Sequence, residues 1–377
     1  MGAERGSASV RVLGTGLVLG DTQPVMLEPP ADIALKRGPA YVCATAPDLR
    51  AVTPGLVRRL GRSQRMMVAA AAQAIAATAL EPKDMVSVAI GTGLGMVADT
   101  VDFLENMIRL DEREPRPAKF INSVHNSAAA NVAIAFGFTG ENRTIIHEGI
   151  SFELALWQAI RSLQSGRSLF ALVGGVDEVS PYIVNVGREK GFWRDACEKL
   201  KPMTRPRTRG TLPGEGAGAL LVCSDRARIP AGSWPIISGV RARPLGVPGA
   251  RRLDASAEVE FIGASAASAG RKLEDVDLFL FGANGDGAAD RAYIKVARAL
   301  EPYIRRDARI GTFKGACGEF HAAGAIGAAL AAQAVRDGAL PAQIDVVRGP
   351  QKGGRISTAV VYSLPQLAYH SVCTVAL

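Results

Sequence analysis

Three residue types that can do covalent and acid–base chemistry lie close together late in the chain. Cys317, Glu319 and His321 all occur in the segment KGACGEFHAAG. A thiol can attack a carbonyl carbon, and a neighbouring carboxylate or imidazole can accept the proton, so this cluster could support acyl transfer or hydrolysis. The structural alternative is that a small cysteine between alanine and glycine is a packing residue.

A second place where chemistry could occur is the turn at residues 147–150, HEGI. A β-branched run, Thr144–Ile146, precedes this turn. A helical pattern follows it from Ser151, a residue type favoured at helix N-caps. The N–H groups and the positive end of such a helix stabilise a thiolate or an oxyanion beside the turn. Gly149 has no side chain that could react there.

Glu148 is the remaining reactive group of this turn, and it could act as a base. Its structural alternative is an ion pair with the nearby Arg143. A rebuilt site would therefore draw on Cys317, Glu319, His321 or Glu148.

The spacing of the motifs around the turn is similar to that of a known family. The helix ends near Gly166, and the apolar run Leu169–Val173 is closed by Gly174-Gly175-Val176-Asp177. The segments at 91–95 (GTGLG) and 210–222 (GTLPGEGAGALLV) match further motifs. Together they resemble the β-ketoacyl-ACP synthases, or ketosynthases, of the thiolase superfamily, over most of the chain.

This resemblance implies an α/β fold of the duplicated thiolase-like type. Two similar halves with mixed five-stranded sheets would stack in an α-β-α-β-α order, as the alternation of strands and helices permits. The N-terminal half would span residues 1–225, with cap loops at 181–209. The C-terminal half would span 226–377, and the two halves would form one compact unit.

The resemblance also implies which reacting groups are missing. The family's Cys-His-His positions are occupied by Gly149, Phe281 and Glu319, whereas the family's lysine is retained as Lys314. A phenylalanine cannot donate a hydrogen bond, and an anionic glutamate would repel a developing enolate. His321 could take the place of the second histidine by moving. Three losses on a scaffold that keeps its glycines favour a subunit kept for its shape.

The chain length factor of type II polyketide systems is such a degenerate copy. The resemblance therefore implies a non-catalytic subunit that pairs with an active ketosynthase, shapes the acyl tunnel and works with acyl carrier protein. The letters SVHN at 123–126 resemble ketosynthase-like proteins of aryl polyene pathways. The candidate tunnel or interface residues are Met107, Phe120, His125, Asn126, Phe138, Thr144, Ile145 and Ile146. Met107, Phe120 and Phe138 could instead be ordinary core, and His125 with Asn126 could cap a helix.

The charge of the chain restricts its partners. Its 44 basic and 36 acidic residues give a net charge of +8. The basic clusters, such as the one at 201–209, carry no interleaved aromatic residues and no nucleic-acid-binding motif, so nucleic acid is not expected. Solvated surface or the docking of an acidic carrier protein accounts for them.

The cysteines and histidines predict no metal site and no disulfide framework. The five cysteines include no C-x-x-C pair, and the four histidines have no metal-binding spacing. No cofactor is expected either. The apolar runs are too short to span a bilayer, and the first residues lack a signal-peptide pattern, so we expect a cytoplasmic protein without membrane insertion.

Overall fold

The computed structural model describes residues 9–20, 23–29, 35–43, 46–113, 117–204, 207–244, 253–351, 353–365 and 368–377. The strands are β1 (Val10–Leu19), β2 (Val25–Leu27), β3 (Gly38–Ala40), β4 (Val86–Thr92), β5 (Asn142–Ile146), β6 (Phe170–Asp177), β7 (Gly216–Cys223), β8 (Ile236–Pro244), β9 (Leu278–Phe281), β10 (Arg309–Thr312), β11 (Asp345–Arg348), β12 (Thr358–Ser363) and β13 (Tyr369–Ala376). The helices are α1 (Pro54–Val57), α2 (Arg62–Ile75), α3 (Val97–Arg109), α4 (Pro117–Ser123), α5 (Ser127–Phe136), α6 (Ser151–Gln164), α7 (Pro181–Glu189), α8 (Ala255–Ser268), α9 (Gly287–Leu300) and α10 (Gly324–Asp337).

The strands of the two halves form one hydrogen-bonded sheet in the order β11-β10-β9-β12-β13-β8-β1-β7-β6-β4-β5. Two five-stranded sheets were expected, and the structure differs in two respects. The halves are joined because Val10 and Arg11 of β1 pair with Ile237 and Ile236 of β8. The C-terminal half also has a sixth strand, β11, which is too short and too charged at its ends to show a strand pattern.

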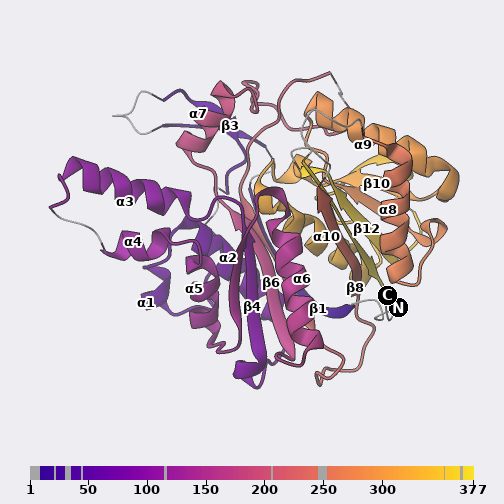
Figure 1. The fold of residues 1–377 in the computed structure, drawn as a ribbon, viewed down its shortest axis with the longest axis horizontal. Coiled ribbons are helices and arrows are strands. Elements are labelled where there is room, and N and C mark those ends of the chain that lie inside the picture. The colour runs from indigo at the N-terminus through magenta and orange to yellow at the C-terminus, as the bar shows by residue number, and fades with distance from the viewer. Residues whose placement is uncertain are drawn as a thin grey trace.

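The helices and the two sets of strands form five layers, as expected (Figure 1). Helices α2 and α5 cover the outer face of the N-terminal strands, and α8 and α9 cover the outer face of the C-terminal strands. Helices α6 and α10 lie between the two sets of strands. The strands β6, β7 and β12 are buried along their whole length, which explains their continuous apolar sequences.

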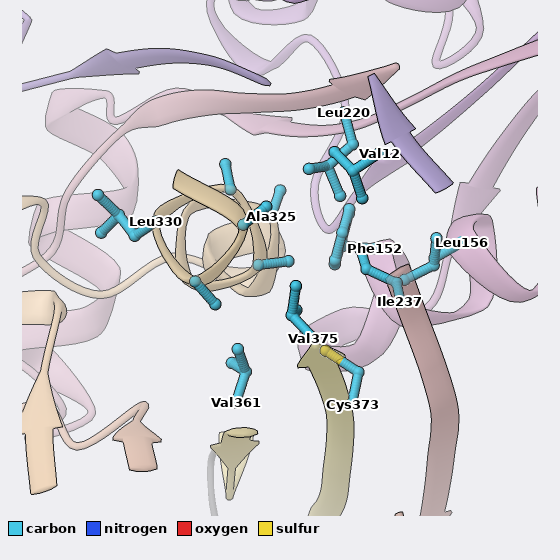
Figure 2. Packing of buried hydrophobic residues seen from close by; sticks show 14 of the residues in the cluster. Val12, Phe152, Leu156, Leu220, Ile237, Ala325, Leu330, Val361, Cys373 and Val375 are labelled. Carbon is cyan, nitrogen blue, oxygen red and sulfur yellow. The ribbon is translucent and has the colours of Figure 1, made fainter. Parts of the chain in front are cut away.

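The central helix α10 approaches the strands closely because its residues are small. A β-carbon added to Gly218 of β7 would lie 2.6 Å from the carbonyl carbon of Ala325, so only glycine fits at that position. Figure 2 shows α10 end on, between side chains of both halves. The labelled residues around it are Val12, Leu220, Val361 and Val375.

The segment at 181–209 is not a loop throughout, and this expectation was partly wrong. Its first nine residues form α7. The helix begins there because Ser180 caps it, accepting a hydrogen bond from the Ile183 N–H, and because Pro181 supplies a first-turn backbone angle. Residues 205–206 of the basic cluster at 201–209 lie outside the described residues.

Candidate active-site region

The turn before α6 holds Gly149 at the position predicted for a nucleophile. Gly149 is buried in the short turn Glu148–Ile150. A β-carbon on Gly149 would overlap Cβ of Pro365 and lie 2.9 Å from its Cγ. Pro365 is fixed in turn by its neighbour, because the Leu364 N–H donates to the Tyr293 hydroxyl oxygen at 2.6 Å. The space that a reactive side chain would need is therefore filled.

Ser151 holds the same turn from inside the helix. Its hydroxyl accepts from the His147 N–H and donates to the Thr92 carbonyl, both at 2.9 Å. The expectation that Ser151 is the N-cap was wrong by one residue, because Ile150 occupies the cap position. The serine instead cross-links the turn to the end of β4.

Glu148 lies on the surface of this turn in a left-handed backbone conformation, with φ +36°. Its candidate partner, Arg143, pairs with Glu141 instead. Among the described residues, no side chain pairs with the exposed Glu148 carboxylate to position it as a base.

Glu319, at the position predicted for the second histidine, is fixed by two hydrogen-bond donors. The Lys314 ammonium contacts Oε1 at 2.6 Å, and the Asn284 amide donates to Oε2 at 2.6 Å. The backbone of Glu319 also exchanges hydrogen bonds with the 212–214 segment. Because both carboxylate oxygens already accept strong donors, Glu319 serves as a structural anchor.

Phe281, at the position predicted for the first histidine, belongs to the core of the C-terminal half. Its ring packs against Tyr293 and Tyr362, with centroid separations of 5.7 and 5.6 Å. Phe281 is fully buried among residues of α8 and α9. The loop that follows Phe281 instead places Asn284, three positions after Phe281, in contact with Glu319.

Asp177, at the end of β6, connects three segments around this region. Its Oδ1 accepts from the Thr92 hydroxyl and the Gly93 N–H, and its Oδ2 accepts from the Ala322 N–H, all at 2.8 Å. Burial raises the pKa of Asp177, and the nearby His321 works against that rise. The His321 ring packs on Gly93, where a β-carbon would lie 2.6 Å from the ring Cδ2.

Cys317 does not lie beside Glu319 and His321 in the cavity, as a nucleophile would have to. Its side chain is fully buried in the central core. Burial raises its pKa to about 12, so the thiolate form is disfavoured. Its thiol faces the carbonyl oxygens of Phe313 and Gly318 at 3.8 and 3.5 Å. The sequence cluster of Cys317, Glu319 and His321 is therefore split between the core and a small cavity.

That cavity has a volume of about 50 Å³. Glu319, His321, Asp177 and Glu178 supply its polar lining, and Leu94, Val179, Ile183, Trp193, Pro213, Gly214 and Phe320 complete it. Small-molecule sites usually enclose roughly 300–1,000 Å³. The cavity can hold a few water molecules but not an acyl chain.

Comparison with known proteins assigns the chain to a family. Residues 36–227, just over half of the chain, match the family described as Beta-ketoacyl synthase, N-terminal domain. The chain belongs to the β-ketoacyl synthase family. A curated relative, "Polyketide synthase GfsB" of Streptomyces halstedii, is 28% identical over 254 residues, which cover 62% of this chain. The match spans only 4% of that relative's length.

Solved ketosynthase structures share the whole fold. A beta-ketoacyl synthase from Burkholderia phymatum STM815 matches with TM-score 0.75 and 16% identity, covering 98% of this chain and 99% of that one. "The ishigamide ketosynthase/chain length factor" matches with TM-score 0.77 and 18% identity over the same shares. A chain of the structure "AntDE:AntF (apo): type II PKS acyl-carrier protein in complex with its ketosynthase bound to the hexaketide" matches with TM-score 0.78 and 17% identity, again over 98% and 99%. The thiolase-like fold is therefore confirmed.

In this ketosynthase-family chain, most of the predicted tunnel or interface residues are exposed or half-buried. Phe120, His125, Asn126 and Ile146 are exposed, and Met107, Thr144 and Ile145 are half-buried. Phe138 differs, because it is buried in the core beside Phe136, with ring centroids 5.8 Å apart. Phe138 lies too deep to form a surface, because its ring fills the space behind β4.

Four residues that organise the ketosynthase-like site were not singled out from the sequence. Asp177 and Glu215 belong to the motifs GGVD and GEGAG, so the sequence could have indicated that they are important. Glu215 is fully buried, accepts from the Cys43 N–H at 2.6 Å and pairs with Arg62. Asn284 and Pro365 carried no such signal, because their roles depend on loops that meet only in the folded chain.

Two further observations concern cofactors and membranes. Within the described residues, no group of three or more His, Cys, Asp or Glu side chains is placed to hold a metal ion. The described helices include none long and apolar enough to cross a membrane.

Proposed function

We propose that this chain is a non-catalytic, chain-length-factor-like subunit that pairs with an active ketosynthase. The observation that carries the proposal is the contact of Pro365 with Gly149. A condensing enzyme needs a nucleophile at this turn to hold the acyl group, and here both the side chain and the room for it are absent. The anchoring of Glu319 by Lys314 and Asn284 adds support, because the residue at the predicted position of the second histidine is an acceptor held by two donors and not a donor for an enolate.

The surface around β5 fits a partner of the same fold. Strand β5 pairs with β4 and is the last strand in the sheet order, so its outer edge offers unpaired backbone groups. Ile146 at the end of this strand is 48% exposed. Exposed apolar side chains occur on helices α3, α4 and α5 and in the turn after α4, namely Leu104, Ile108, Phe120, Ile121, Val124 and Ile134. Apolar surface of this kind is typical of protein interfaces.

The subunit would then act in chain elongation on acyl carrier protein, in a type II polyketide pathway of the aryl polyene kind. Exposed basic residues such as Arg58 and Arg59 supply charge that suits an acidic carrier protein. The walls of the acyl tunnel would come from the exposed apolar residues of α3 and α4, which face the partner in this arrangement.

Co-expression with a ketosynthase that has the full Cys-His-His set tests the pairing. Light scattering on the purified material should give a 1:1 heterodimer, and the ketosynthase should elongate acyl chains only in that complex. Ile146→Asp should weaken the complex without unfolding the chain, because the residue is exposed. A stable homodimer that ignores the ketosynthase would contradict the proposal.

A stand-alone acyltransferase with a rebuilt site is the alternative function. It requires an accessible nucleophile, and the burial of Cys317 speaks against this thiol. Incubation of the isolated chain with acyl carrier protein loaded with an acyl group should leave its intact mass unchanged. A covalent adduct that is lost in Cys317→Ala would support the alternative.

A further inference from the structure

A second, larger hollow shares no lining residue with the small cavity. It is a groove of about 370 Å³ lined by Glu153, Leu154 and Trp157 of α6, by Val240, Arg241 and Ala242 of β8, and by Phe261 of α8. Its volume falls within the range of small-molecule sites. The groove exists because β1 pairs only with Ile236 and Ile237, which leaves the rest of this edge of β8 uncovered.

A bulge in β8 shapes the wall of the groove. Arg241 pairs with Val372 and Ser238 pairs with Thr374, so Gly239 and Val240 together form an extra step in the strand. Gly239 has φ +61°, and a β-carbon there would lie 2.7 Å from Ser265 Oγ. Bulges redirect side chains and are common beside functional sites. Here Val240 of the bulge lines the groove itself, and the paired residues Arg241 and Ala242 follow it directly.

The lining combines aromatic rings with cations. Trp157 is 42% exposed, and the Arg161 guanidinium lies 4.7 Å from its ring centroid. On the other wall, the Arg243 guanidinium lies 4.4 Å from the ring centroid of Phe261. Arg243 is already paired with Glu258 at 3.1 Å. Arg241 is exposed, and within the described part of the chain its guanidinium makes long hydrogen bonds, at 3.4 Å to the Ala264 carbonyl and 3.3 Å to the Ser268 hydroxyl.

The buried side of the groove carries an incompletely bonded acid. The Glu153 side chain is more than nine-tenths buried, and its Oε1 accepts from the Ser371 hydroxyl at 2.9 Å. Its Oε2 has no partner among the described residues. Burial raises the pKa of Glu153, which favours the protonated acid and therefore a hydrogen-bond donor.

We infer that this groove binds a small aromatic carboxylic acid. The flat ring would lie between Trp157 and Phe261, whose walls suit stacked or edge-on aromatic contact. The carboxylate would pair with Arg241, whose planar guanidinium matches a carboxylate and whose present hydrogen bonds are weak enough to exchange. A ligand amine would face like charge from Arg241 in the lining and from Arg161 beside Trp157, so the groove selects against cations.

The residues that line the groove are not among those proposed for pairing with a ketosynthase. Binding of the aromatic acid can therefore be tested without a ketosynthase partner. Isothermal titration of the full chain with 2-naphthoate should show 1:1 binding, and neutral 2-naphthamide should bind at least about tenfold more weakly. Arg241→Ala should weaken naphthoate binding by about tenfold or more, and Arg241→Lys by less, because lysine keeps the charge but not the fork. Arg228→Ala, at an exposed arginine outside the lining, is the matched control and should change nothing.

Three results would overturn the inference. One is the absence of naphthoate binding at millimolar concentration, and another is equal binding of acid and amide. The third is a groove occupied by a second copy of the chain, seen as a dimer that Arg241→Ala dissociates and that binds no naphthoate. Circular dichroism of each variant shows that loss of binding is not loss of fold.

Discussion

Pro365 packs directly on Gly149, and its ring atoms occupy the space that a β-carbon on Gly149 would need. Gly149→Ala should therefore lower the free energy of unfolding by about 1–3 kcal/mol, the usual range for an overpacked core. Gly149→Cys should be at least as costly. Urea unfolding followed by circular dichroism measures both.

Pro365→Gly should restore part of that loss when it is combined with Gly149→Ala, because it removes the overlapping ring atoms. Gly55→Ala is the control, since a β-carbon there meets nothing within 4 Å. If Gly149→Ala were as stable as the parent, the space beside the turn would be open and the main support for a non-catalytic role would be lost.

Lys314 and Glu319 form a buried ion pair, with side chains only 5% and 11% exposed. Lys314→Met should destabilise the chain by about 3–5 kcal/mol, because it leaves the largely buried carboxylate without its charged partner and with Asn284 as its remaining donor among the described residues. The double variant Lys314→Met/Glu319→Gln should cost clearly less than the sum of the single changes.

A double-mutant cycle in urea measures this coupling between Lys314 and Glu319. The exposed pair Lys272 and Glu274 gives the reference, since surface pairs contribute about 0–1 kcal/mol. A coupling for the buried pair as small as that reference would show that Glu319 is not anchored as described.

The cysteines should differ sharply in reactivity. Cys197 is exposed, whereas Cys317 is fully buried with its pKa raised to about 12 by burial. Iodoacetamide at neutral pH should therefore modify Cys197 in the native chain and leave Cys317 unmodified until the chain is denatured. Peptide mass mapping reads the sites, and Cys197→Ala is the control. Rapid native modification of Cys317 would revive its candidacy as a nucleophile.

Asp290 should make stability fall as pH rises. Burial raises its pKa to about 6 from 3.8, although its oxygens accept from the N–H groups of Met203 and Gly285. Because the pKa of Asp290 is higher in the folded chain than in the unfolded chain, the protonated carboxyl stabilises the folded state below pH 4. This stabilisation is lost as the pH rises through 6. The loss should be on the order of 2 kcal/mol.

Asp290→Asn isolates this effect from those of other buried acids. The variant lacks one acceptor at every pH, so it should be less stable overall, but its stability relative to the parent should improve between pH 4 and pH 7. Glu274→Gln, at an exposed acid, should show no such trend. Parallel pH profiles for parent and Asp290→Asn would contradict the raised pKa.

The sequence predicts most of the elements correctly because their patterns are local. The apolar run after Gly166 is β6, the pattern from Ser151 is α6, and the alanine-rich segment after His321 is α10. The short charged strand β11 and the helix α7 were missed, because neither has an apolar period long enough to detect.

The candidate site was less predictable because its contacts join distant segments. The absence of a side chain at Gly149 is visible in the sequence, but its contact with Pro365 spans 216 positions. The proximity of Cys317, Glu319 and His321 in the sequence suggested a shared site. In the structure, however, the Cys317 side chain lies in the core and His321 lies near Asp177. Where a side chain points is decided by packing, which short-range spacing does not encode.

Strand β1 lies in the middle of the sheet, with β7 on one side and β8 on the other. The two strands that pair with β1 are synthesised long after it, since Arg11 pairs with Cys223 of β7 and with Ile236 of β8. During translation β1 must wait until Cys223, roughly 200 residues later, has left the ribosome before either of its edges is paired. Such high contact order implies slow folding and a nascent chain that needs protection from aggregation while it waits.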